Sequence, residues 1–271
     1  MIQNLPIIHA LWIGKKLGEI SRACLHSFVM RGHQVYLHTY ADIEDVPEGV
    51  QCIDANKIIP ESKIIKHNET GSYALFSDVF RYELMKQVDG IYVDCDVYCL
   101  KLILIPEHGY LLGFEDDEWI NGAILRIPKE SELINQLLKA AYDPQFVPPW
   151  YSSSRQFRLK AKKIFGMGKS LSDMPWGVIG PKAITYYVKK LNLSKLIQPI
   201  DIFYPVHYQC ISQLCDANLK LSDITTSRTL GIHLYNEMLK GVDLNHLHHE
   251  SILYKLLKNE IAISDQLRKV L

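Results

Sequence analysis

The chain has 271 residues and no formal net charge, because 30 lysine and arginine residues balance 30 aspartate and glutamate residues. Hydrophobic residues make up 48% of the sequence and charged residues 22%. These values are typical of a globular protein and exclude a disordered, collagen-like or coiled-coil chain. A chain without net positive charge is not expected to bind polyanions over its whole surface, so we expect no nucleic acid partner.

The cysteines and the apolar segments bear on location. The six cysteines form no C-x-x-C pair and match no zinc-ribbon spacing, so we expect reduced thiols in a reducing compartment. The opening MIQNLPIIHALW lacks a basic region followed by an apolar core. The longest apolar run, residues 102–106, is far shorter than the roughly 20 residues that span a bilayer. We therefore expect a cytoplasmic protein, with peripheral contact at the inner membrane face.

The first part of the chain predicts a strand–helix–strand order. A strand at 7–12 ends at Gly14, and a helix follows over 17–30. Residues 34–40 alternate apolar and polar side chains, which is typical of a strand, and 51–54 form a third, short strand. This order favours an α/β fold with a largely parallel sheet.

The clearest predicted helix covers residues 72–89. Its aromatic and aliphatic side chains recur every four positions, which gives it a broad buried face. The sequence then predicts strands at 91–93, 110–114 and 121–127 and a helix at 131–142. Residues 143–149 hold three prolines and mark the main internal boundary. Beyond it we expect a strand-to-turn segment at 176–181 and helices at 182–191 and 251–258.

One segment beyond the boundary is strongly basic. Residues 155–169 carry six positive charges and no negative charge, with Phe157, Ile164 and Phe165 between them. Cations that alternate with apolar side chains are typical of an interfacial segment, so we expect peripheral membrane contact here. A solvated basic helix face and a site for an acceptor phosphate are the alternatives.

Two carboxylates, Asp94 and Asp96, directly follow the predicted strand at 91–93. Side chains at i and i+2 of an extended chain point to the same side, so the two carboxylates converge. A hard divalent cation such as Mn²⁺ or Mg²⁺ relieves their repulsion and can hold a diphosphate. Two solvated loop aspartates are the alternative.

A second polar group lies on the helix that precedes this strand. Ser77, Asp78 and Arg81 fall within about 100° of one another on a helix, in a polar stripe opposite the aromatic face. A carboxylate and a guanidinium held together suit a sugar, because one accepts hydrogen bonds from hydroxyls and the other donates them. An exposed ion pair of little consequence is the alternative.

The run that contains both groups resembles the core of the sugar-binding-region glycosyltransferases that carry a D-x-D motif. This family includes bacterial polysaccharide enzymes, yeast mannosyltransferases of the Och1 type and relatives of α1,4-galactosyltransferase. The glucosylating domains of large clostridial toxins are more distant kin. The residues that match its S-D-x-x-R-Y, G-G-x-Y and D-x-D pattern are Ser77, Asp78, Arg81, Tyr82, Gly90, Tyr92, Asp94 and Asp96. Asp89 stands where the family has its first glycine.

Other segments resemble the same family in the same order. Pro6, His9, Trp12 and Gly14 match its opening, residues 121–124 its asparagine strand, and Gly180 and Pro181 its downstream turn. The similarity is strong over residues 5–130 and patchy beyond. It implies a GT-A type, Rossmann-like fold with additional C-terminal helices, as one domain over 1–271. Residues 1–142 would form the nucleotide-sugar-binding core, and 143–271 the acceptor-side and C-terminal helical part.

The resemblance also implies an activity. The chain would be a metal-dependent, retaining glycosyltransferase that moves a hexose from a nucleotide diphosphosugar, first of all a UDP-sugar. The acceptor would be a glycan or lipid-linked glycan in polysaccharide synthesis of the capsule or O-antigen type. A secreted effector that glycosylates a host protein is one alternative. A non-catalytic sugar-binding relative of the fold is another.

The site residues follow from the same resemblance. It implies that Asp78, Arg81, Asp96 and Asn121 are catalytic, that Trp12, Ser77, Tyr92 and Asp94 bind the donor, and that Asp94, Asp96 and His233 hold Mn²⁺ or Mg²⁺. The family continues from its histidine as H-x-x-x-S-W, and the serine and tryptophan are missing here, so a structural role for His233 stays open. Trp12 likewise fits a core aromatic.

Overall fold

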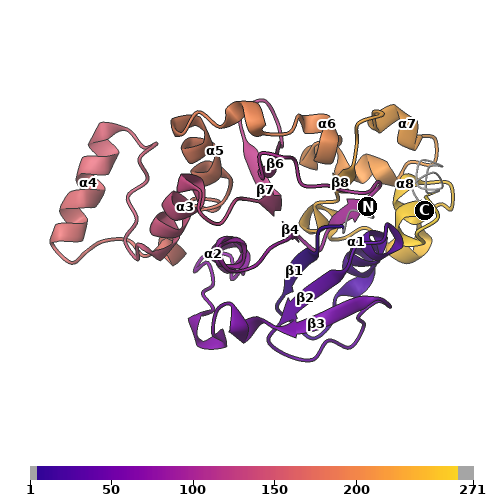
Figure 1. Ribbon diagram of the computed structural model, residues 1–271, viewed down its shortest axis with the longest axis horizontal. Coiled ribbons are helices and arrows are strands. Elements are labelled where there is room, and N and C mark those ends of the chain that lie inside the picture. Colours follow the sequence, from indigo (N-terminus) through magenta and orange to yellow (C-terminus); the bar gives the residue numbers. More distant parts are fainter. Residues whose placement is uncertain (1–4, 262–271) are drawn as a thin grey trace.

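A six-stranded sheet runs through the centre of the part of the chain that the structure describes, residues 5–261 of a computed structural model (Figure 1). Its strands lie in the order β3-β2-β1-β4-β7-β6, and a second sheet pairs β5 with β8. The strands are β1 (Ile8–Trp12), β2 (Val35–Thr39), β3 (Val50–Asp54), β4 (Ile91–Val93), β5 (Val97–Cys99), β6 (Leu111–Phe114), β7 (Ile120–Arg126) and β8 (Gly231–His233).

Helices cover both faces of this sheet. The α-helices are α1 (Gly18–Met30), α2 (Ala74–Gln87), α3 (Glu132–Tyr142), α4 (Ser153–Ile164), α5 (Pro181–Lys190), α6 (Ile200–Phe203), α7 (Leu221–Ile224) and α8 (Ile252–Leu257). Short 3-10 helices cover Ala55–Lys57, Glu61–Lys63, Leu171–Asp173, Ser194–Leu196, Tyr208–Cys215, Asn236–Leu239 and Leu244–His246. Each element predicted before residue 143 is present, with ends that differ by no more than two residues.

The predicted α/β fold is confirmed. β1 pairs with β2 and β4, and β2 pairs with β3, all in parallel. β7 runs antiparallel to both β4 and β6, which makes the sheet mixed at one edge. A parallel sheet needs apolar side chains on both of its faces, because helices cover both. The central strands meet this requirement and are almost fully buried.

Side chains of the central strands alternate between the two helical layers, because a strand turns successive residues to opposite faces. Ala10 and Val93 pack in the layer of α1. Leu11 and Tyr92 pack in the layer formed by α2, α3 and α5. Asp94 has the same parity as Tyr92. It therefore leaves β4 on the side of α2, where the polar stripe of that helix lies.

The turn from α2 into β4 requires a glycine at position 90. Gly90 has a φ of +137°, and a Cβ there would lie 2.5 Å from the carbonyl oxygen of Ile7. Asp89 needs no such freedom. Its exposed carboxylate faces Arg126 at 3.6 Å and Lys129 at 3.1 Å. The departure from the G-G pattern at position 89 is thus accommodated on the surface.

Two short strands that the sequence did not predict form the second sheet. β5 and β8 pair antiparallel, with Val97 opposite His233. Tyr98 of β5 and Ile232 of β8 join the apolar side chains of α8 in a further hydrophobic cluster, whereas Val97 and Cys99 pack in the layer of α1. Asp96 immediately precedes β5. The pairing therefore brings this carboxylate beside a strand from the last part of the described chain.

The strand predicted within residues 176–181 is wrong. The segment forms a turn that leads straight into α5, and the Val178 N–H donates to the Pro175 carbonyl at 3.2 Å. Gly177 has a φ of +72°, which ends extended structure. Pro181 occupies the first turn of α5, where the N–H that proline lacks would have no helical partner.

All six cysteines are free, and Cys24, Cys95 and Cys99 are buried. Within residues 5–261, none of the helices combines the length and the apolar character needed to cross a bilayer. The cytoplasmic location stays a prediction.

A buried pair of histidines lies beneath α2. His9 Nδ1 and His38 Nε2 are 3.0 Å apart, and His9 Nε2 lies 3.1 Å from the carbonyl oxygen of Asp89. Since the carbonyl can only accept, His9 Nε2 donates, and His9 Nδ1 accepts from His38. His38 Nδ1 is then left buried without a partner. Burial, and then the proximity of His9, lowers the pKa of His38 to about 3.

This pair predicts that the protein loses stability in acid. Between pH 6.5 and about 3 the unfolded chain binds a proton at His38 that the folded chain refuses, so the free energy of unfolding falls as the pH falls. One such group contributes at most about 1.4 kcal/mol per pH unit. Urea titrations from pH 7 to 4 measure this slope. His38→Gln keeps a donor toward His9 but cannot titrate, so the slope should decrease. The exposed control His108→Gln should leave it unchanged.

Candidate functional site

The polar stripe of α2 is buried, so the alternative of an exposed ion pair is wrong. Asp78 and Arg81 are only 7% and 6% exposed. Arg81 Nη2 donates to Asp94 Oδ1 at 3.0 Å and to Ser77 Oγ at 3.1 Å, and its Nη1 lies 3.7 Å from Asp78 Oδ1. The guanidinium therefore links both carboxylates, one from α2 and one from the end of β4.

Tyr92 holds the same carboxylate from the β4 side. Its hydroxyl donates to Asp94 Oδ1 at 2.9 Å and accepts from Ser77 Oγ at 3.0 Å. The Arg81 guanidinium carbon lies 4.8 Å from the centre of the Tyr92 ring. Asp94 Oδ1 is thus occupied by two donors. Oδ2 stays free of these contacts, on a side chain that is 27% exposed.

Two glycines make room for this cluster. A Cβ on Gly122 of β7 would lie 2.7 Å from Arg81 Nη1, and one on Gly180 would lie 2.5 Å from Asp78 Oδ2. The Asn-Gly strand and the Gly-Pro turn of the sequence pattern therefore both meet the stripe of α2. Tyr82, one turn along α2, donates to the Ile179 carbonyl at 2.7 Å and fixes this turn against the helix.

Asp96 faces the second sheet. Its Oδ1 lies 3.2 Å from His233 Nε2, and its Oδ2 accepts from the backbone N–H of Asn236 at 2.9 Å. Its carbonyl also accepts from the Leu234 N–H at 2.8 Å. The segment after β8 therefore wraps around Asp96 with side-chain and backbone donors.

Tyr235, which the sequence analysis did not single out, shapes this wrap. It takes a left-handed conformation, with φ 47° and ψ 60°. This conformation costs a non-glycine residue of order 1 kcal/mol and is found mostly where the surroundings require it. Its ring packs against that of His233 at an interplanar angle of 41°, with centroids 3.9 Å apart. The sequence gives no signal for a left-handed backbone at Tyr235, because such a position is usually occupied by glycine or asparagine.

Ionisation of the site is strongly perturbed. Burial, and then Asp94, raises the pKa of Asp78 to about 6, although Arg81 acts in the opposite direction. Burial also opposes ionisation of Asp96 and of His233. Their mutual attraction and hydrogen bond, together with the Asn236 N–H at Asp96 and with Asp94 and Glu115 near His233, outweigh burial, so the pKa of Asp96 is lowered and that of His233 is raised.

Asp94, Asp96 and His233 fit a divalent cation. Each offers a ligand atom, and these atoms all lie within 4.8 Å of one another. His233 Nδ1 is buried without a hydrogen-bond partner, so the protein alone leaves a polar atom of this cluster unsatisfied. Two carboxylates and one imidazole form a donor set that suits Mn²⁺, and the carboxylates also suit Mg²⁺.

The remaining predicted residues, Trp12 and Asn121, lie at the same end of the sheet, where β1 and β4 end and the antiparallel β7 begins. Trp12 ends β1, next to β4, and its Nε1 is buried without a partner. Asn121 begins the Asn-Gly pair of β7. Its Oδ1 accepts from the Ala123 N–H at 2.7 Å, while the Ala123 carbonyl accepts from the Asp94 N–H at the same distance. Asn121 therefore supports the strand that positions Asp94, and within residues 5–261 its side chain makes no hydrogen bond to the cluster.

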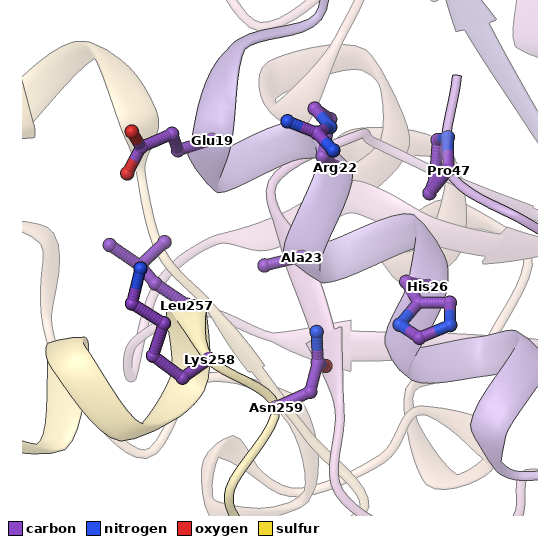
Figure 2. A pocket seen from close by; sticks show the side chains of 8 residues that line it. All are labelled: Glu19, Arg22, Ala23, His26, Pro47, Leu257, Lys258 and Asn259. Atoms are coloured by element: carbon purple, nitrogen blue, oxygen red, sulfur yellow. The ribbon is translucent and has the colours of Figure 1, made fainter. Parts of the chain in front are cut away.

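Two surface hollows lie outside this cluster. One, of 270 Å³, lies between α1 and α8, and none of its lining residues is a predicted site residue (Figure 2). The other, of 550 Å³, is lined in part by Asp116 and Asp117, in the turn between β6 and β7, and by Pro199, Ile200 and Asp201. The second adjoins Phe114, the last residue of β6. It is the roomier of the two.

Comparison with known proteins gives distant similarities. No family model matches the sequence. A curated relative, subversion of eukaryotic traffic protein A of Legionella pneumophila subsp. pneumophila, is 24% identical over 227 residues, which is 79% of this chain. The chain spans only 31% of that relative's length.

Two solved structures are similar in fold. PaToxG glycosyltransferase matches with a TM-score of 0.41 and 16% identity, over 71% of this chain and 73% of that one. The apo structure of the WbbM bifunctional glycosyltransferase matches with a TM-score of 0.46 and 9% identity, over 98% of this chain and 51% of that one.

Proposed function

We propose that this chain is a metal-dependent glycosyltransferase that moves a hexose from a nucleotide diphosphosugar, in the first place a UDP-sugar, to an acceptor hydroxyl. The convergence of Asp94, Asp96 and His233 beside the buried Asp78–Arg81 pair is the observation that supports this best. The first three residues can hold a cation and, with it, a diphosphate. The Asp78–Arg81 pair can hold a sugar, and Arg81 also contacts Asp94, so it joins the two groups.

Each part of the cluster has a role in this proposal. Asp94, Asp96 and His233 hold Mn²⁺ or Mg²⁺, which when bound stabilises negative charge on the departing diphosphate. Arg81 and Asp78 orient the hexose, one by donating to its hydroxyls and the other by accepting from them. Tyr92 and Ser77 keep Arg81 and Asp94 in place through the hydrogen bonds given above. Trp12 contributes to binding of the donor, and Asn121 contributes to catalysis.

The acceptor side is assigned to the second half of the chain. Residues 1–142 supply the nucleotide-sugar core within a single domain, and 143–261 of the described chain supply α5 and β8 around it. The 550 Å³ hollow beside Asp116 and Asp117 offers carboxylates to acceptor hydroxyls. The division into a core and an acceptor side, and the role of the hollow in binding the acceptor, both belong to the proposal.

The acceptor has two candidates. A glycan, free or lipid-linked, in capsule or O-antigen type synthesis is the first, as the resemblance implies. The second is a protein of a host cell, with the chain acting as a secreted effector. The similarity to subversion of eukaryotic traffic protein A supports this second candidate, because that relative is named for an action on eukaryotic cells.

Metal removal is the first test of the activity. We expect the purified protein to hydrolyse one nucleotide sugar slowly in the presence of Mn²⁺, and to lose this activity in excess chelator. A panel of UDP- and GDP-sugars, with release of the nucleotide diphosphate as readout, identifies the donor. Hydrolysis that persists in chelator contradicts the metal-dependent proposal. Binding of a donor without hydrolysis is what the non-catalytic sugar-binding alternative predicts.

A further inference from the structure

Helix α4 stands apart from the rest of the fold. It lies at the end of the molecule opposite α8 (Figure 1), and none of its residues is buried. Its polar contacts come from one face and reach the segment before the helix and the end of α3. Gln156 donates to the carbonyls of Pro149 and Tyr151 at 3.0 and 2.7 Å, and Lys163 pairs with Asp143 at 2.8 Å.

The free face of α4 is apolar. The four most exposed large apolar side chains of the described chain are Ile164 (81%), Phe157 (76%), Phe165 (74%) and Met167 (65%). Phe157 and Ile164 are seven residues apart, so they lie within about 20° of each other around the helix axis. Phe165 and Met167 continue directly from the end of the helix. Exposed apolar side chains gathered in this way mark an interaction surface.

Cations surround this apolar face. Arg158, Lys160 and Lys162 are exposed, and within residues 5–261 they make no ion pair. The segment 155–169 contains no acidic residue that could neutralise them. Local charge is therefore strongly positive, although the whole chain is neutral. A partner that buries the apolar side chains must also present negative charge around them.

We propose that α4 and the residues up to Met167 form a docking surface for an anionic lipid bilayer. Apolar side chains at the tip of a helix enter the boundary between headgroups and acyl chains, and the flanking cations contact acidic headgroups. The surface is separate from the catalytic cluster. Membrane binding is therefore expected even in variants that cannot transfer sugar.

Flotation with lipid vesicles tests this proposal. We expect the full chain to bind vesicles of phosphatidylcholine mixed with phosphatidylserine, to bind phosphatidylcholine alone poorly, and to be released by salt. The variant Arg158→Gln, Lys160→Gln, Lys162→Gln should bind about a hundredfold more weakly. The variant Phe157→Ser, Ile164→Ser should lose about tenfold or more. Both alter exposed side chains, so their melting temperatures should match that of wild type.

A matched control separates this surface from charge in general. Lys57→Gln, Lys63→Gln, Lys195→Gln removes the same number of exposed cations away from α4 and should leave vesicle binding nearly unchanged. The proposal is overturned if the control loses as much as the α4 variant, or if neutral and acidic vesicles bind equally well. It is also overturned if no vesicle binds at low salt, which is what an acceptor-phosphate site or an acidic protein partner predicts.

Discussion

Replacement of Asp96 by asparagine is expected to lower sugar transfer by about a thousandfold and to leave the fold intact. Asp96 is the carboxylate that His233 and the Asn236 N–H both contact, and asparagine keeps its shape while removing its charge. Loss of one preorganised electrostatic partner typically costs 10²–10³ in turnover. A thousandfold corresponds to about 4 kcal/mol of activation free energy. An amide oxygen can still accept from the Asn236 N–H, so the fold should survive, but loss of the charge beside His233 should lower the melting temperature.

The dependence on Mn²⁺ shows whether the loss comes from metal binding. If Asp96 is a ligand, Asp96→Asn should need a higher Mn²⁺ concentration, and excess Mn²⁺ should restore part of its turnover. UDP binding should weaken in Mn²⁺ and be unchanged in chelator. The exposed control Asp42→Asn should behave as wild type. Full turnover of Asp96→Asn at the wild-type Mn²⁺ concentration would contradict the proposed role.

The first half of the site could be predicted because its residues are close in sequence. The helical positions of Ser77, Asp78 and Arg81, together with a strand that ends at Asp94, nearly determine their convergence. Alternation along β4 places Tyr92 and Asp94 on the side of α2. Burial of the pair was not predictable from this pattern. It depends on Gly180, from the turn before α5, which packs against Asp78.

The second half of the site depends on pairing between distant segments. His233 meets Asp96 because β5 pairs with β8, and each is only three residues long. Strands of this length carry almost no periodicity, so hydrophobic patterning cannot detect them. The left-handed Tyr235 that directs the Asn236 N–H to Asp96 is set by tertiary packing. Residues 176–181 form a turn and no strand for a local reason, namely Gly177, Gly180 and Pro181.

Substitutions at Asp78 and Arg81 are expected to distinguish orientation of the sugar from binding of the nucleotide. Arg81 contacts Asp94 at 3.0 Å, so Arg81→Lys should weaken Mn²⁺-dependent UDP binding as well as turnover. Among residues 5–261, the ion pair of Asp78 is the longer one to Arg81, at 3.7 Å. Asp78→Asn should therefore lower turnover by about a hundredfold, or about 2.7 kcal/mol, with UDP affinity nearly unchanged. A lysine is preferred to alanine at position 81, because alanine would leave two uncompensated carboxylates.

The pH profile adds a test specific to Asp78. Burial raises its pKa to about 6, so if the carboxylate is the active form, wild-type turnover should rise with pH through about 6. Asp78→Asn should lack this rise, because the amide resembles the protonated acid at every pH. Steady-state donor hydrolysis from pH 5 to 8, beside UDP titrations, measures both effects. If Asp78→Asn keeps the rise, another group titrates. If it instead loses UDP affinity and turnover equally, Asp78 supports the nucleotide site or the fold and does not orient the sugar.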